Sequence, residues 1–180
     1  MNHSTITTGQ ASAIEAMLAS MPNIPSGVGS KENDCSIAAI NLALTGKLTD
    51  VIPDCMSVAI GRWIIKVQDS APADLRNSER WRRLLPLAAG TGRDRDAERC
   101  SVALDWMWSV ALPRLKPLAD KHGFGESWQK MCDLRTDAAA YAAAAYAAAA
   151  YAAADADFWH SVDPCGCLER MINLPEGDRK

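Results

Sequence analysis

The sequence lacks the signatures of the common enzyme classes. Its three histidines, His3, His122 and His160, stand in no catalytic motif. It shows no nucleophile elbow, no paired-carboxylate pattern and no zinc-protease helix. The glycine turn at residues 90–93 does not end in the G-K-[ST] of a Walker loop. These absences predict a non-enzymatic protein that needs no cofactor.

Membrane and export signals are also missing. The N-terminus has no basic stretch followed by a continuous apolar run, so we expect no secretory signal. The uncharged run at residues 138–154 consists of alanine and tyrosine and has no Leu, Ile or Phe, so we expect no membrane contact. The six cysteines are then expected to stay reduced in a cytoplasm.

The cysteine spacing is weak evidence for a metal site. Cys165 and Cys167 form a C-x-C pair, and Cys132 and His160 are the other candidate ligands. A single C-x-C fits zinc, a redox pair or two buried thiols at the start of a helix. Because no second motif completes a ligand set, we expect buried thiols and no metal.

Strand patterns are absent as well, since valine and isoleucine nowhere alternate with polar residues between turn signals. Helical spacing of apolar residues instead predicts an all-α, irregular bundle of about seven or eight helices. The main segments are 8–20, 34–45, 53–69, 78–90, 94–113, 126–134 and 163–174. Residues 21–33 carry two prolines and two glycines. We therefore expect an N-terminal helix and flexible linker over 1–30 and a single helical domain over 31–180.

The run at residues 138–156 is almost entirely alanine and predicts one long helix near the C-terminus. Its tyrosines, Tyr141, Tyr146 and Tyr151, recur every five residues and so do not share one helix face. The run suits either a packed structural helix or a slim surface for a partner or for self-association. Trp106 and Trp108 point in nearly opposite directions on a helix, so one of them is a further candidate partner residue.

The best candidate for a small ligand is a glycine turn that leads into a helix. Between Arg62 and Lys116, Lys and Arg exceed Asp and Glu by 11 to 7, whereas the whole chain has a net charge of −3. A helix N-terminus and arginine side chains favour phosphate or a nucleotide. The candidate ligand residues are Gly90, Thr91, Gly92, Arg93, Arg95, Arg99, Arg80, Arg82 and Arg83. The alternatives are a plain turn with arginines paired to nearby acids, a basic patch that faces a protein, and nucleic-acid binding, which the overall acidity disfavours.

Several stretches resemble a set of small proteins encoded in bacteriophages and bacterial genomes. They are CSIAAINLALTGKLTDVIPDCMSVAIGRWIIKVQD, LPLAAGTGR, DWMW and FWHSVDPCGCLERMI, together covering about residues 30–174. The family also has an Ala/Tyr-rich run before a W-x-x-V-D-P-C ending, here Trp159 to Cys165. The resemblance implies a phage or prophage protein that binds a host or phage protein in a bacterial cytoplasm. Inhibition of a host defence system is one role it implies.

Overall fold

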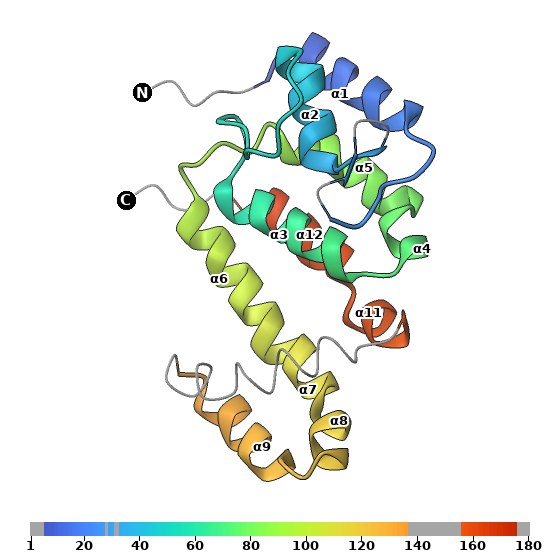
Figure 1. Ribbon diagram of the computed structural model, residues 1–180. Helices are drawn as coiled ribbons and strands as arrows, with labels where there is room; N and C mark the ends of the chain where they lie inside the picture. The colour runs from blue at the N-terminus through green and yellow to red at the C-terminus, as the bar shows by residue number, and fades with distance from the viewer. Residues whose placement is uncertain (1–5, 28, 31–32, 137–155, 176–180) are drawn as a thin grey trace. The chain divides into compact units, whose positions relative to one another are not determined.

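The computed structural model describes residues 6–27, 29–30, 33–136 and 156–175 (Figure 1). They belong to two compact units, unit 1 from residues 1–102 and 164–180 and unit 2 from residues 103–163. Strands β1 (Gly29–Ser30) and β2 (Asn33–Asp34) form a two-residue antiparallel ladder. All other regular elements in the described ranges are helical, which confirms the predicted all-α class and its irregular helices.

Unit 1 contains the helices of the N-terminal half and the last helix of the chain. They are α1 (Thr8–Ser20), α2 (Ser36–Thr45), α3 (Val58–Ser70), α4 (Ala73–Arg76), α5 (Glu79–Ala88) and α12 (Pro164–Ile172). Helix α6 (Asp96–Trp106) begins in unit 1 and crosses its boundary at residue 102.

The first two helices begin and end at residues that suit caps. Thr7 and Gln10 form a reciprocal capping box at the start of α1. Gly46 ends α2 in a left-handed conformation, as the sequence predicted. The cap of α2 is Cys35, whose sulfur accepts from the Ala38 amide, so the helix begins two residues later than the predicted segment over 34–45. Helix α1 packs against α2 and α5, so its contacts place it in unit 1, whereas the sequence suggested a separate segment over 1–30.

Helix α3 starts five residues later than the sequence predicted. Pro53 does not open the helix, because residues 53–56 form a turn in which the Met56 amide donates to the Pro53 carbonyl at 3.0 Å. Ser57 is the cap and accepts from the Ile60 amide at 3.2 Å. The interval between the predicted helices over 53–69 and 78–90 contains the single turn of α4.

Helix α12 closes the core of unit 1. Its Leu168 and Met171 side chains are fully buried. Figure 1 shows this C-terminal helix, in red, beside α3, and it also packs against α5. The core of unit 1 therefore joins segments from both ends of the chain.

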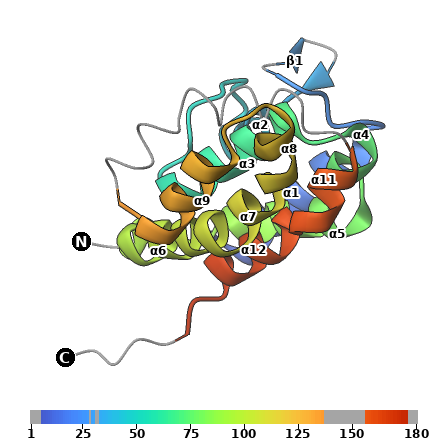
Figure 2. The ribbon, with the colours of Figure 1, turned by 90° about the horizontal axis from the view of Figure 1, so that it is seen from below.

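Unit 2 contains shorter helical pieces. A π-helical segment (Met107–Ala111) leads into α7 (Leu112–Arg114), followed by α8 (Lys116–Lys121), α9 (Gly125–Leu134) and α11 (Ala156–Val162). Pro113 lacks the N–H that a continuous helix needs and lies in α7, which directly follows the π-helical segment that divides the predicted helix over 94–113, and Pro117 lies in the first turn of α8. Helices α8 and α9 lie side by side in Figures 1 and 2.

Two indole N–H groups donate hydrogen bonds within unit 2. Trp106 donates to the Val162 carbonyl at 2.7 Å, and Trp128 donates to the Leu112 carbonyl at 2.9 Å. The Ala-rich run at 138–156 lies almost wholly outside the described residues. Within the described residues, no helix combines the length and the apolar character that a membrane crossing requires.

Candidate functional site

The predicted phosphate turn is tied into unit 1 by its own backbone. Gly92 has a φ of 60°, and its amide donates to the Cys55 carbonyl at 2.9 Å. The Thr91 hydroxyl donates to the Ala88 carbonyl at 2.7 Å and accepts from the Ser57 amide at 3.1 Å. The turn therefore anchors residues 55–57, and its N–H groups do not form an open cradle.

Arg99 is a structural residue, contrary to its predicted place in a ligand site. Its side chain is 4% exposed and donates to the carbonyls of Thr91, Gly92 and Met171 at 2.8, 3.1 and 3.2 Å. Burial lowers the pKa of this guanidinium, and Asp96, 3.8 Å away, acts in the opposite direction. The group joins the turn to the end of α12, so a phosphate has no access to it.

Asp96 fills the anion position that a helix start provides. One carboxylate oxygen accepts from the Ser57 hydroxyl, and the other accepts from the Val58 amide at 3.1 Å. Because these donors lie at the start of α3, an internal carboxylate occupies the anion position of that helix, which is a different helix start from the predicted phosphate site before α6.

The other predicted arginines also have partners inside the protein. Arg93 pairs with Asp54 at 2.9 Å and donates to the Ile52 carbonyl. Arg95 pairs with Glu98 and donates to the Pro175 carbonyl at 2.8 Å. The structure therefore favours the alternative of a turn with arginines paired to nearby acids.

The second arginine cluster holds helices together. Arg80 of α5 makes two bonds of 2.9 and 2.7 Å to Glu169 of α12. Arg82 donates to the carbonyls that end α1, those of Leu18, Met21 and Pro22. Arg83 is exposed beside Arg82 in a pocket of about 460 Å³ that Glu15 and Glu79 also line, and these carboxylates disfavour an anion there.

The Arg80–Glu169 pair gives a pH-dependent contribution to stability. Hydrogen bonding to Arg80 lowers the pKa of Glu169, so the pair stabilises the fold above the unfolded pKa and is lost as the pH falls through the folded one. We expect Glu169→Gln to cost under about 1 kcal/mol at pH 7, and progressively less as the pH falls below the ordinary glutamate pKa of about 4.3. Urea unfolding at pH 7 and at successively lower pH tests this, with Glu15→Gln as the exposed control. A loss that does not change with pH would contradict it.

The predicted partner residues are only partly described. Trp106 is buried and bonded to Val162, so it is unsuited to a partner surface. Trp108 is half-buried, and Tyr141, Tyr146 and Tyr151 lie outside the described residues. None of the six cysteines forms a disulfide bond. No cluster of three metal-binding side chains occurs among the residues that the structure describes.

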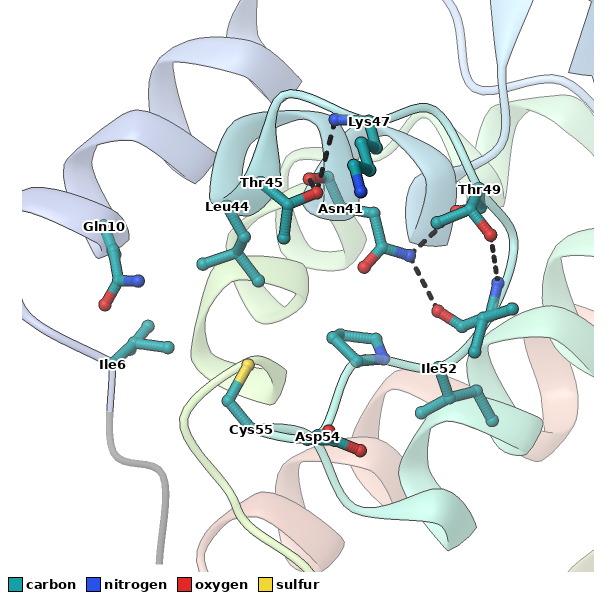
Figure 3. A pocket seen from close by; sticks show the side chains of 12 residues that line it. Ile6, Gln10, Asn41, Leu44, Thr45, Lys47, Thr49, Ile52, Asp54 and Cys55 are labelled. Atoms are coloured by element: carbon teal, nitrogen blue, oxygen red, sulfur yellow. Dashed lines mark hydrogen bonds between the residues drawn. The ribbon is translucent and has the colours of Figure 1, made fainter.

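A pocket that the sequence analysis missed lies in unit 1 beside the segment between α2 and α3 (Figure 3). Its volume is about 610 Å³, within the range of ligand pockets. We call it the loop pocket. It is lined by Ile6, Gln10, Asn41, Leu44, Thr45, Lys47, Thr49, Val51, Ile52, Pro53, Asp54 and Cys55.

Asn41 connects helix α2 to the loop that forms the opposite wall of the loop pocket. This side chain of α2 is 4% exposed, and its Nδ2 donates to the carbonyls of Thr49 and Val51 at 2.8 and 2.7 Å. The two bonds fix which end of the amide is nitrogen. In Figure 3 the Oδ1 atom faces the open space between Leu44 and Cys55. No described residue donates a hydrogen bond to it.

Residues 47–55, which we call the anchored loop, are fixed at further points. Ile52 covers Gly61 of α3 so closely that a Cβ on Gly61 would lie 2.7 Å from two of its side-chain carbons. The Cys55 carbonyl accepts from Gly92, as described above. The loop is therefore ordered, although its Leu48 and Val51 side chains are 47% and 66% exposed.

The remaining polar groups of the pocket differ in charge. The Lys47 side chain extends toward Asn41 in Figure 3, and no described carboxylate pairs with its Nζ. Asp54 forms a solvent-exposed ion pair with Arg93 at 2.9 Å. Burial raises the pKa of the Cys55 thiol, which favours the neutral, weakly polar form at this wall.

One sequence signal could have led to this pocket. Asn41 interrupts the apolar run Ile37–Leu44, and a polar side chain in such a run needs a buried partner. The sequence does not show that the partners are carbonyls eight and ten residues later. Compared with known proteins, the chain matches no protein-family model, no curated protein and no solved structure.

Proposed function

We propose that the protein is a non-enzymatic binding protein that contacts a partner protein through the anchored loop and the loop pocket. The observation that carries this proposal is an anchored loop that leaves Leu48 and Val51 exposed, where Val51 lines the pocket and Leu48 stands between the lining residues Lys47 and Thr49. Isolated exposed apolar residues are common, but two on one fixed loop beside a cavity favour a binding surface. A fixed loop also loses little conformational entropy when it binds.

The resemblance to small phage-encoded proteins supports a bacterial partner. Inhibition of a host defence system is the role that such a binding protein would most simply perform, since inhibition needs occupancy of a surface and no chemistry. The internal partners of the arginines, described above, disfavour the alternative of a phosphate-binding protein.

The test is native mass spectrometry of the tagged full-length protein, purified gently from a bacterial host. We expect a co-purifying protein that the Leu48→Asp/Val51→Asp variant depletes by about tenfold or more, because charge at a desolvated contact is costly. Leu87→Asp is the matched control, since Leu87 of α5 is 52% exposed and lies outside the pocket lining. Thermal unfolding followed by circular dichroism shows that each variant is folded.

Two results would contradict the proposal. One is a partner that the double variant retains as well as the unaltered protein does. The other is the absence of any co-purifying protein from every host tested, combined with a stable, folded protein.

A further inference from the structure

Three features of the loop pocket together define the chemistry of its ligand. The buried Asn41 presents an Oδ1 that accepts no hydrogen bond from the described residues. Lys47 presents a cation with no carboxylate partner among those residues. Between them the walls are apolar, from Ile6, Leu44, Val51, Ile52 and Pro53. The ligand therefore needs a hydrogen-bond donor, a negative charge and an apolar group close together.

Asn41 Oδ1 opens on the pocket and accepts no hydrogen bond from the described residues, so a donor is the first requirement. Phosphate meets the charge requirement but brings no apolar group, and a fatty acid brings no N–H for Asn41. An internal peptide segment has N–H groups and side chains but no backbone charge. The end of a polypeptide chain has all three, because its last residue carries an amide N–H, a side chain and a carboxylate on one Cα atom.

We propose that the loop pocket binds the C-terminal end of a partner protein whose last residue is apolar. The terminal carboxylate pairs with Lys47, the last amide N–H donates to Asn41 Oδ1, and the last side chain lies on Leu44 and Ile52. Carboxylate capture of this kind is a recurring mode of peptide recognition. This inference rests on the proposed function, and it adds which part of the partner is recognised.

Charge complementarity supports this occupant over others. The one carboxylate in the lining, that of Asp54, is held by Arg93 at 2.9 Å, which offsets its repulsion of an incoming anion. The volume of about 610 Å³ leaves room for more than one residue, so the preceding residues of the partner also enter. Val51 then contacts these preceding residues, and Leu48 stands between the lining residues Lys47 and Thr49.

The test is an NMR titration of the ¹⁵N-labelled full-length protein with acetylated tetrapeptides Ac-Gly-Ser-Ala-X, where X is Val, Leu, Ile, Met or Phe. Each peptide is used as the free acid and as the C-terminal amide. We expect at least one acid to shift the amide signals of residues 47–55 and its amide twin to bind about tenfold more weakly. Lys47→Gln should weaken the acid about tenfold and abolish the difference between acid and amide. Lys66→Gln, at an exposed lysine of α3, is the matched control and should change neither.

Equal binding of acids and amides, or no shift by any acid at about 5 mM, would overturn the inference. N-acetyl-leucine distinguishes a free acylated amino acid from a chain end, and equal affinity for it and for the peptides would also overturn the inference. Failure here is separable from failure of the proposed function. If a captured protein still depends on Leu48 and Val51 while no peptide binds, the partner contacts the loop but does not insert its C-terminus.

Discussion

Replacement of Gly61 with alanine is expected to destabilise unit 1 by about 2 kcal/mol. The new Cβ would meet three carbons of the Ile52 side chain at 2.7–2.8 Å, closer than van der Waals contact allows. The β-branched Ile52 has few rotamers in which to escape, so the anchored loop itself has to move. Alanine has the higher helix propensity, which offsets about 1 kcal/mol of the clash. Chemical denaturation of the full-length protein measures the net loss.

A double-mutant cycle isolates this contact. Ile52→Ala removes all three clashing carbons, so in that background Gly61→Ala should stabilise the protein by about 1 kcal/mol through helix propensity alone. Gly9→Ala in α1 is the matched control, because its Cβ would meet only the Thr7 hydroxyl at 3.9 Å. If Gly61→Ala destabilises equally with and without the Ile52 side chain, the close packing of the loop on α3 is not its cause.

Removal of the Arg99 guanidinium is expected to be the most damaging change of a charged residue in unit 1. Arg99→Met preserves the bulk of the side chain but leaves the carbonyls of Thr91, Gly92 and Met171 buried without these donors. Asp96 also loses its nearby cation. A loss of about 3 kcal/mol is expected, since each deprived buried acceptor carries a desolvation cost. Thermal and urea unfolding give the value.

Arg93→Met is the matched control for this prediction. Arg93 stands in the same turn, but its pair with Asp54 is largely exposed to solvent, so its removal should cost under about 1 kcal/mol. Similar losses from the two variants would show that the bonds of Arg99 to the backbone do not stabilise the turn. Arg99→Lys should rescue only part of the loss, because an ammonium group cannot reproduce the planar fork of the guanidinium.

Sequence patterns predicted the helices better than the site. The predicted helix over 8–20 has the observed bounds of α1, and the predicted helix over 34–45 ends where α2 ends, at Thr45 before Gly46. The start of α3 was wrong because Pro53 is a good first-turn residue in isolation, whereas Ser57 becomes the cap through the distant Asp96. Long-range partners of this kind leave no periodic trace in the sequence.

The same reason explains why the arginines were predicted to bind phosphate. A cluster of arginines beside a glycine turn is compatible with phosphate binding and with structural bonds, and the acceptors that decide the matter are far along the chain. Met171 is 72 residues from Arg99, and Glu169 is 89 residues from Arg80. The loop pocket escaped prediction because its walls come from the start of α1, from α2 and from the following loop, and only the polar Asn41 marked it.

The return of α12 to unit 1 has a consequence for synthesis on the ribosome. Residues 1–102 emerge first, but their apolar surface on α3 and α5 stays uncovered until Leu168 and Met171 have been translated. In the sequence, unit 2 lies entirely between these two parts. A change in its length therefore alters the length of chain that connects residue 102 with residue 164. Closure entropy grows slowly with length, about 0.6 kcal/mol for each doubling. Length changes between the helices of unit 2 are therefore expected to destabilise unit 1 less than the loss of its last helix.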